Sequence, residues 1–278
     1  MKTRLLHLSD LHLGANDRPE IEPALRSLIE RVQPAAIVAS GDLTHRGTRA
    51  QHERAGAFLR SFDLPVVAIP GNHDIPYSFP ARFTRPWAEF DRVWETTQPL
   101  FQQEGLLVVG LNSVRPWRHQ SGRIRPAQLE RAATLLRAAA PHDLRVVTLH
   151  HHLLGAPWRA RRKRPVAQRN RVLGALVDAG ADLILAGHIH QGAVSERHEF
   201  ELSFGNERTV VISIAPGLGQ PRPHRRGEAR GLHVYALDAE ELIVETYVWR
   251  EALDDWGLTA ERRFPRGTQP IARVAAPR

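Results

Sequence analysis

Short apolar runs alternate with amphipathic stretches along the first two thirds of the chain. In residues 21–32 the apolar side chains recur at spacings of three and four, the period of an α-helix with one buried face. Between such stretches lie short runs of Leu, Ile, Val and Ala, which predict buried β-strands. This alternation is typical of parallel β-α-β units and predicts an α/β fold. We expect strands at 5–8, 37–39, 66–69, 106–111, 146–149 and 183–186, and helices at 21–32, 51–62, 128–139 and 166–179.

The pattern changes after Gly187. Strand-like runs now follow one another without intervening helices, at 193–194, 209–214, 231–237 and 242–249. Such runs predict an antiparallel meander, which we expect to form a second sheet. No Ser/Gly-rich linker and no internal repeat divides the chain, so we expect one domain over residues 1–252. Residues 253–278 are rich in Arg, Pro and Ala and predict a tail that is partly disordered.

Composition narrows the possible chemistry. The 278 residues include no cysteine, which excludes disulfides, thiolate zinc sites, iron–sulfur ligation and a cysteine nucleophile. No apolar run approaches the ~20 residues of a membrane-spanning helix, and the first residues lack a secretory signal, so we expect a cytoplasmic chain. The net charge of +8 comes from bases that are almost all Arg. Either an Arg-rich codon bias or an anionic partner explains this charge.

Side chains that can bind metal ions follow five of the expected strands. The carboxyl ends of parallel strands meet at one edge of a sheet, and ligands bind there in open α/β folds. We therefore expect these side chains to converge, although they are spread over residues 10–190. They are Asp10 and His12, then Asp42, then Asn72 and His73, then His150, His151 and His152, and finally His188 and His190.

The residue types in these loops indicate two metal ions. Two carboxylates, one amide and several imidazoles form a mixed set that suits Mn, Fe, Zn, Ni or Co better than Mg or Ca alone. About seven ligands exceed the four of a single tetrahedral ion, whereas two ions that share a carboxylate would use them all. Two such ions can clamp a phosphoryl group and activate a water molecule for in-line attack.

The ordered set of motifs resembles the calcineurin-like metallophosphoesterase superfamily over about residues 4–237. The sequence Gly-Asn-His-Asp at 71–74 is similar to the bacterial phosphodiesterase branch, while the protein Ser/Thr phosphatases carry an additional Asp that is missing at 44–47. Softer matches to the class III cyclic nucleotide phosphodiesterases occur at 111–113, 122–124, 128–129 and 226–228. A Pro often follows the His pair in relatives, and Leu153 stands in this region instead.

This resemblance implies a four-layer α/β/β/α sandwich of two stacked mixed sheets flanked by helices. It also implies that a metal-bound hydroxide attacks phosphorus and that His73, which is not a ligand, assists the leaving group. Among the three consecutive imidazoles we prefer His150 over His151 and His152, because it comes first after the strand. The implied ligands are Asp10, His12 and His190 for one ion, Asn72, His150 and His188 for the other, and Asp42 as the bridge.

The substrate expected from this resemblance is a small phosphodiester such as a cyclic nucleotide. The alternatives are a pyrophosphatase for a nucleotide-linked lipid, a nuclease, or a metal-binding scaffold without catalysis. A nucleic acid partner is less favoured, because the chain has no room for capping domains, and no sequence feature indicates an oligomeric state. His119 lies in a loop that either is solvated or borders the pocket. Residues expected to contact substrate are His45 and Arg46, together with Arg161 and Arg162 of the basic segment 159–171.

Overall fold

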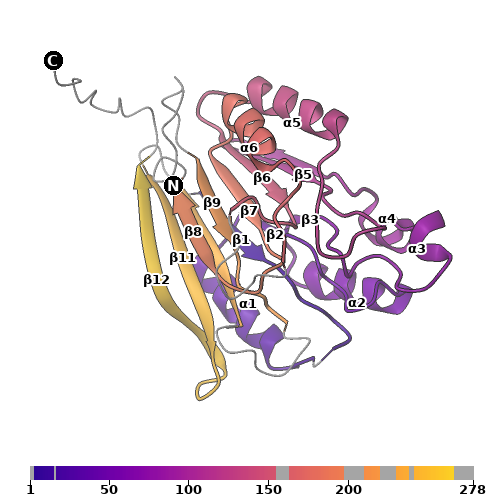
Figure 1. Ribbon diagram of the computed structural model, residues 1–278. Coiled ribbons are helices and arrows are strands. Elements are labelled where there is room, and N and C mark those ends of the chain that lie inside the picture. The colour runs from indigo at the N-terminus through magenta and orange to yellow at the C-terminus, as the bar shows by residue number, and fades with distance from the viewer. Residues whose placement is uncertain are drawn as a thin grey trace.

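Two mixed β-sheets lie face to face, and helices cover their outer faces (Figure 1). The structure is a computed structural model that describes residues 3–15, 17–154, 163–196, 210–219, 230–237 and 241–265. The arrangement is the four-layer α/β/β/α sandwich that the resemblance implies, so the predicted fold class is confirmed. No helix in the described part of the chain is long and apolar enough to cross a bilayer.

Each sheet has six strands; three neighbouring strands are parallel in the first sheet and four in the second. The first sheet has the order β12 (Asp255–Pro265), β11 (Glu241–Arg250), β10 (Gly231–Leu237), β1 (Thr3–Leu8), β2 (Ala36–Ala39) and β3 (Val66–Ala68). The second sheet has the order β4 (Leu100–Gln103), β5 (Leu106–Leu111), β6 (Leu144–Leu149), β7 (Leu183–Ala186), β9 (Val211–Ile214) and β8 (Ala193–Glu196).

The helices α1, α2, α5 and α6 form within about three residues of the predicted bounds, whereas α3 and α4 were not predicted. In α1 the apolar residues Leu25, Leu28 and Val32 are buried on one face, and the helix ends where Gln33 adopts a left-handed conformation. The remaining helices are α2 (Arg49–Arg60), α3 (Ala81–Thr84), α4 (Ala88–Trp94), α5 (Pro126–Ala138) and α6 (Arg169–Asp178), and α1 spans Ile21–Val32.

The core consists of three apolar layers. One lies between the first sheet and the helices α1 and α2, and another lies between the second sheet and α5 and α6. The third fills the space between the sheets and includes Leu5, Val38, Val146 and Tyr235. Because both faces of the central strands are covered, β2, β5, β6 and β7 are buried along their whole length.

The parallel strands end in register at the same edge of each sheet. Leu8 pairs with Ala39, and Ala39 pairs with Ala68, so the loops after β1, β2 and β3 leave the sheet side by side. In the second sheet Thr148 pairs with Leu185 in the same way. The two sheets therefore present their ligand-bearing loops to one common region, as their parallel order predicts.

The expectation that the late strands form a sheet of their own is wrong. β9 pairs in parallel with β7, β8 pairs with β9, and both extend the second sheet. β10 pairs antiparallel with β1 instead, which places β10, β11 and β12 in the first sheet. The apolar pattern predicted the strands themselves, but it records which residues are buried and does not specify which neighbouring strand each one pairs with.

The sheet extends beyond the domain boundary expected at residue 252. Residues 255–265 form β12 and pair along β11, with Trp256 and Phe264 buried. Residues 258–263 between them are exposed, and three of these, Glu261, Arg262 and Arg263, are charged, because β12 is the edge strand of the sheet. This composition resembles that of a polar tail, so the sequence pattern did not predict the strand. Residues 266–278 lie outside the described part of the chain.

Candidate metal centre

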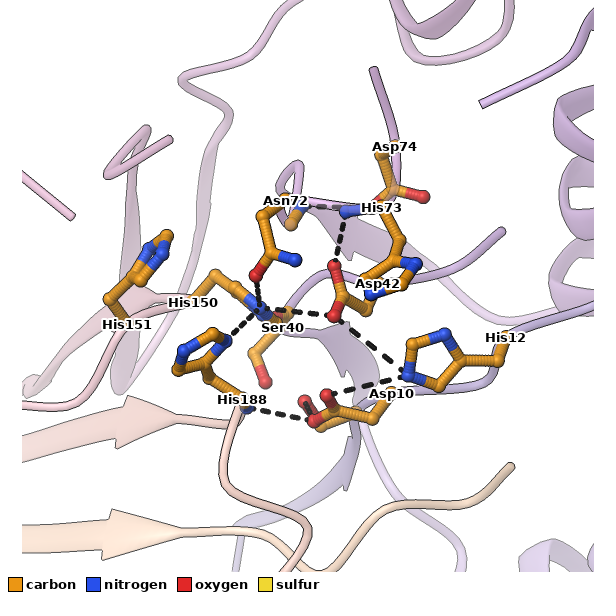
Figure 2. Close-up of polar contacts among 12 residues, drawn as sticks. Asp10, His12, Ser40, Asp42, Asn72, His73, Asp74, His150, His151 and His188 are labelled. Atoms are coloured by element: carbon orange, nitrogen blue, oxygen red, sulfur yellow. Dashed lines mark hydrogen bonds and ion pairs between the residues drawn. The ribbon is translucent and has the colours of Figure 1, made fainter. Parts of the chain in front are cut away.

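Five loops converge at the carboxyl ends of β1, β2, β3, β6 and β7 (Figure 2). They bring together two triads of buried side chains, and within each triad the ligand atoms lie within 4.8 Å of one another. The predicted convergence of side chains from residue 10 to residue 190 is therefore present in the structure. The first triad is Asp10, His12 and His190, and the second is Asp42, His150 and His188.

The first triad points lone-pair donors at a common centre. The Nε2 atom of His190 lies 3.1 Å from Oδ1 of Asp10 and 3.2 Å from Nε2 of His12. The other carboxylate oxygen of Asp10, Oδ2, accepts hydrogen bonds from the hydroxyl of Ser9 and the backbone N–H of His188. Oδ1 is buried and accepts no hydrogen bond from any described residue. A buried, orphaned carboxylate oxygen facing two imidazoles fits a bound cation.

The second triad is completed by an amide. The Nε2 atom of His150 lies 3.4 Å from Oδ2 of Asp42, 3.2 Å from Oδ1 of Asn72 and 3.2 Å from Nδ1 of His188. The other ring nitrogen of His150, Nδ1, donates to the backbone carbonyl of Ser40. This bond fixes the tautomer that leaves the Nε2 lone pair directed at the centre, as in metal-ligating histidines.

Asp42 lies between the two triads. Its Oδ2 is 3.4 Å from Nε2 of His150 and 3.8 Å from Nε2 of His12. Its Oδ1 accepts a hydrogen bond of 2.7 Å from the backbone N–H of His73. Oδ2 of Asp42 thus faces an imidazole of each triad, while the hydrogen bond to Oδ1 fixes the orientation of the carboxylate. A carboxylate in this position could bridge two ions.

Both carboxylates are ionised in their buried positions. Burial by itself raises the pKa of Asp10, but the His190 imidazole beside it lowers the pKa to well below its usual range. Burial likewise raises the pKa of Asp42, and His150 and neighbouring imidazoles lower it further than burial raises it. The centre therefore carries two buried negative charges that attract cations.

The imidazoles have diverging pKa values. Burial lowers the pKa of His12 to about 3, and it also lowers the pKa of His188 well below its usual range. Burial lowers the pKa of His150 too, but the Asp42 carboxylate outweighs it and the result is a pKa of about 9. At neutral pH His12 and His188 are therefore neutral and can bind metal, while His150 must release a proton to do so.

Unusual backbone conformations direct the ligands inward. Five ligands have a positive φ, a conformation that is uncommon for residues other than glycine and concentrates at functional sites. Close approach of the loops also requires two glycines: a Cβ at Gly71 would overlap the backbone and carboxylate of Asp42, and one at Gly187 would overlap Ser9. The positive-φ ligands are Asp10 at 52°, His12 at 48°, Asp42 at 51°, His188 at 74° and His190 at 56°.

Asp74 fastens the ligand loops to each other, a role that sequence reasoning missed. Its Oδ1 accepts from the backbone N–H and the hydroxyl of Thr44, at 2.8 and 2.9 Å. Its Oδ2 accepts from the backbone N–H groups of Leu43 and Gly71, at 3.1 and 2.8 Å. Asp74 is buried and follows the third strand, so its position among the candidate ligands was the available signal, but Leu43 and Thr44 lie about 30 residues away in sequence.

His73 stands beside the first triad with one nitrogen tied back. Its Nδ1 lies 2.8 Å from the backbone carbonyl of His45, which can only accept, so Nδ1 carries the proton. Its ring meets that of His12 edge-on, with centroids 4.7 Å apart. The rings of His45 and His73 are stacked 5.9 Å apart, and the nitrogens of His12, His45 and His73 form a third close group.

Tyr77 and His119 connect His73 to Asn72. The Asn72 amide nitrogen donates to Nδ1 of His119 at 2.9 Å, because the amide oxygen faces His150. Nε2 of His119 then carries the proton and lies 2.9 Å from the Tyr77 hydroxyl, which is 2.8 Å from Nδ1 of His73. His119 therefore borders the site. No sequence signal pointed to Tyr77, whose role depends on the fold of the loop after Asp74.

The remaining predicted residues are placed differently. The ring of His151 turns toward Ser113, whose hydroxyl lies 2.9 Å from its Nδ1, so His150 reaches the Asp42 carboxylate where His151 does not. Arg46 is exposed, and its backbone N–H donates to Gln51. Arg161 and Arg162, together with 226–228, lie outside the described residues.

Comparison with known proteins gives a consistent result. The family model of the calcineurin-like phosphoesterases matches residues 3–192. Similar proteins include one from Escherichia coli K12 named 3′,5′-cyclic adenosine monophosphate phosphodiesterase CpdA, which is 28% identical over 236 residues (80% of this chain and 79% of that protein). A Synechococcus protein named as a probable cyclic nucleotide phosphodiesterase is 29% identical over 139 residues, 47% of this chain and 51% of that protein.

Solved structures share the fold. A purple acid phosphatase from yellow lupin has a TM-score of 0.72 at 12% identity and covers 96% of this chain, which spans 54% of that longer chain. A dimetal phosphatase from Danio rerio has a TM-score of 0.63 at 13% identity, covering 95% of this chain and 98% of its own. A Plasmodium protein described as the anchor in the inner membrane complex has a TM-score of 0.61 at 12% identity, covering 97% of this chain and 90% of that chain. At these identities the likeness concerns the fold alone.

Proposed function

We propose, from the premise that this chain belongs to the calcineurin-like phosphoesterase family, that it hydrolyses 3′,5′-cyclic nucleotides at a centre of two divalent metal ions. The chain is a metal-dependent phosphoric diester hydrolase. The observation that carries the proposal is the position of Asp42, whose Oδ2 faces His12 of one triad and His150 of the other. The names of the bacterial relatives support a cyclic nucleotide as the substrate.

The donor set fits two ions. Mixed carboxylate, amide and imidazole donors suit Mn, Fe, Zn, Ni or Co, and the second group is completed by the Asn72 oxygen. When bound, the two ions supply an activated water nucleophile and neutralise charge on the phosphoryl oxygens. The proposed ligands are Asp10, His12 and His190 for one ion, Asn72, His150 and His188 for the other, and Asp42 between them.

His73 is the proposed acid of the reaction. Its Nδ1 proton is committed to the carbonyl of His45, so Nε2 is the nitrogen that exchanges a proton with substrate. Opening of a 3′,5′-cyclic phosphate breaks the bond between phosphorus and O3′, and the departing ribose oxygen takes a proton to give a nucleoside 5′-phosphate. A positioned acid contributes about 10²–10⁴-fold to such a step.

Substrate contacts are proposed around this imidazole. His45 stacks on His73 and lies 6.3 Å from the ring of His12, so its ring borders the space that the phosphate would occupy. Arg46 is exposed beside it and supplies a positive charge. Arg161 and Arg162 stay a prediction from sequence. Their expected effect is faster capture of anionic substrates, with a dependence on salt.

A substrate panel tests the proposal. Purified protein with Mn²⁺ is assayed on 3′,5′-cyclic AMP, bis(p-nitrophenyl) phosphate, a nucleotide diphosphate conjugate and single-stranded DNA. We expect hydrolysis of the cyclic nucleotide and the simple diester, abolished by EDTA and by Asp42→Ala. Preferential cleavage of the diphosphate conjugate or of DNA would contradict a cyclic nucleotide as the substrate. Full metal content without turnover of any diester would indicate a scaffold and refute an enzyme.

A further inference from the structure

A cavity of about 580 Å³ lies between α3, α4, the loop 112–125 and the start of α5. None of the candidate metal ligands lines it. The same loop nevertheless connects it to the metal centre: Trp117 lines the cavity, and two residues later His119 contacts the ligand Asn72. Arg82 holds the loop in this position by donating to the backbone carbonyl of Pro116 at 2.8 Å.

The walls of the cavity are positively charged. Arg115, Arg123 and Arg125 line it, and no Asp or Glu is among its described lining residues. None of the three guanidinium groups forms an ion pair with another residue that the structure describes. The helix α5 begins at the cavity with Pro126, which has no backbone N–H, and the N–H groups of Gln128 and Leu129 donate to the carbonyl of Arg125. Attraction of an anion therefore comes from the guanidinium groups, which favour a bound phosphate.

One side of the cavity offers an aromatic surface. The rings of Phe83 and Trp117 are stacked with centroids 4.1 Å apart and an angle of 20°. Trp117 is nevertheless 74% exposed, far more than the buried tryptophans Trp249 and Trp256. An exposed indole that is already held parallel to a second ring is a surface on which a planar base can stack.

The inner wall carries two amide side chains, of which Asn112 accepts a hydrogen bond from the backbone N–H of Val114. Asn112 and Gln128 line the cavity and are only 6% and 8% exposed. The amide oxygen of Gln128 accepts no hydrogen bond from any described residue. Buried acceptors without a donor are rare in proteins, and a ligand hydroxyl or amino group would satisfy this one.

We propose that this cavity binds a nucleoside phosphate, with the phosphate at Arg123 and Arg125 and the base against Trp117. Its volume lies within the range of small-molecule sites, and its combination of aromatic, cationic and amide groups matches the three parts of such a ligand. The nucleoside phosphate is either a free nucleotide or the remote half of an extended diester substrate. The proposal does not depend on which diester the metal centre hydrolyses.

Calorimetric titration with 5′-AMP tests the site. The full-length protein is titrated with Mn²⁺ present, both as wild type and as Asp42→Ala, in which the metal centre is disabled. We expect Asp42→Ala to retain one AMP site. Adding Arg123→Ser with Arg125→Ser should weaken that site about tenfold or more, and so should adding Trp117→Ala. Since these three side chains are mostly exposed, the variants should fold, and circular dichroism checks this.

A matched control separates a site from general charge. Arg131 and Arg137 are exposed on α5 and lie outside the cavity. Replacing both with Ser removes the same charge as the Arg123 and Arg125 replacements. We expect this pair to leave AMP binding unchanged. Equal weakening by the control pair, or AMP binding that the Arg123 and Arg125 replacements do not alter, would overturn the site. If inorganic phosphate binds as tightly as AMP and Trp117→Ala has no effect, the nucleoside part of the proposal is wrong.

Kinetic measurements distinguish the two sources of the ligand. If the cavity holds the remote half of a substrate, the Arg123 and Arg125 replacements should raise KM for a linear 5′-phosphorylated dinucleotide and spare bis(p-nitrophenyl) phosphate. If it holds a free nucleotide, AMP should change the turnover of bis(p-nitrophenyl) phosphate by the wild type, and the same replacements should abolish this response. The titration reads binding directly, so it can succeed even where the proposed cyclic nucleotide activity fails.

Discussion

Replacement of Asp74 by Asn should loosen the two loops that carry the bridging carboxylate and the amide ligand. The Asp74 carboxylate is buried and accepts four hydrogen bonds, two at each oxygen. Two of its donors belong to Thr44, close after Asp42, and a third is the backbone N–H of Gly71, directly before Asn72. The substitution preserves the size of the side chain and replaces the carboxylate with a neutral amide that presents a donor in place of one acceptor.

The cost follows from the number of donors that lose an acceptor. Asn presents an NH2 group in place of one oxygen. In one orientation of the amide this group faces the N–H donors of Leu43 and Gly71; in the other it faces the N–H of Thr44, whose hydroxyl can donate to the carbonyl of His73 instead. One or two buried donors are therefore left unpaired, and at about 1–3 kcal/mol each the free energy of unfolding falls by about 1–6 kcal/mol. For a domain of this size the loss corresponds to a fall in Tm of roughly 2–24 °C.

Urea denaturation followed by circular dichroism measures the stability of the wild type and the variant. Hydrolysis of bis(p-nitrophenyl) phosphate, measured at urea concentrations below the unfolding transitions of both proteins, gives the turnover per folded molecule. Asp143→Asn is the matched control, because Asp143 is also buried and accepts backbone N–H groups of Gly105 and Ala140, but its partners carry no ligand. We expect both variants to lose stability and Asp74→Asn alone to lose turnover. A stable Asp74→Asn protein with normal turnover would refute the role assigned to this carboxylate.

Three further predictions concern the site. Asp42→Ala should abolish diesterase activity, because it removes the proposed bridging ligand. His73→Ala should lower turnover about 10²–10⁴-fold and leave the metal content, measured by elemental analysis, unchanged. Loss of metal from the His73 variant would show that His73 is a ligand or supports one. Tyr77→Phe should lower turnover of a cyclic nucleotide about tenfold and that of bis(p-nitrophenyl) phosphate much less, because only the poor leaving group needs an oriented His73; equal losses on both substrates would contradict this. In the metal-free protein His150 is protonated below its pKa of about 9 and must lose this proton to bind a metal ion. Metal affinity should therefore rise from pH 7 to pH 9 and level off above pH 9. Metal titrations that show no rise over this range would contradict a protonated His150.

Most of the local structure and the parallel order of the early strands could be predicted from the sequence, but the pairing of the late strands could not. The expected helix at 21–32 and the strands at 106–111, 183–186 and 231–237 have the same bounds in the structure. Their apolar period depends on burial of one face or of both, which the residues record directly. Pairing depends on which apolar edge a strand meets, and no residue of β10 distinguishes β1 from a neighbour among the late strands.

The convergence of the candidate ligands could be predicted because each follows a strand that the pattern locates. Their supports are harder to predict, because a hydrogen bond such as that from Thr44 to Asp74 depends on the conformation of two loops. Tyr77 is an example, since its contacts with His73 and His119 arise only after the loop 112–125 folds back on the motif. The edge strand β12 was missed for a similar reason, because its burial rests on two aromatic side chains.

Anomalous diffraction from crystals grown with Mn²⁺ tests the central claim, that five loops assemble one dinuclear centre around a bridging carboxylate. We expect two anomalous peaks, one at each triad, about 3.5–4 Å apart. Asp42 should lie within a ligand-bond length, about 2.0–2.2 Å, of both. A single peak, or two peaks of which Asp42 reaches only one, would contradict the account.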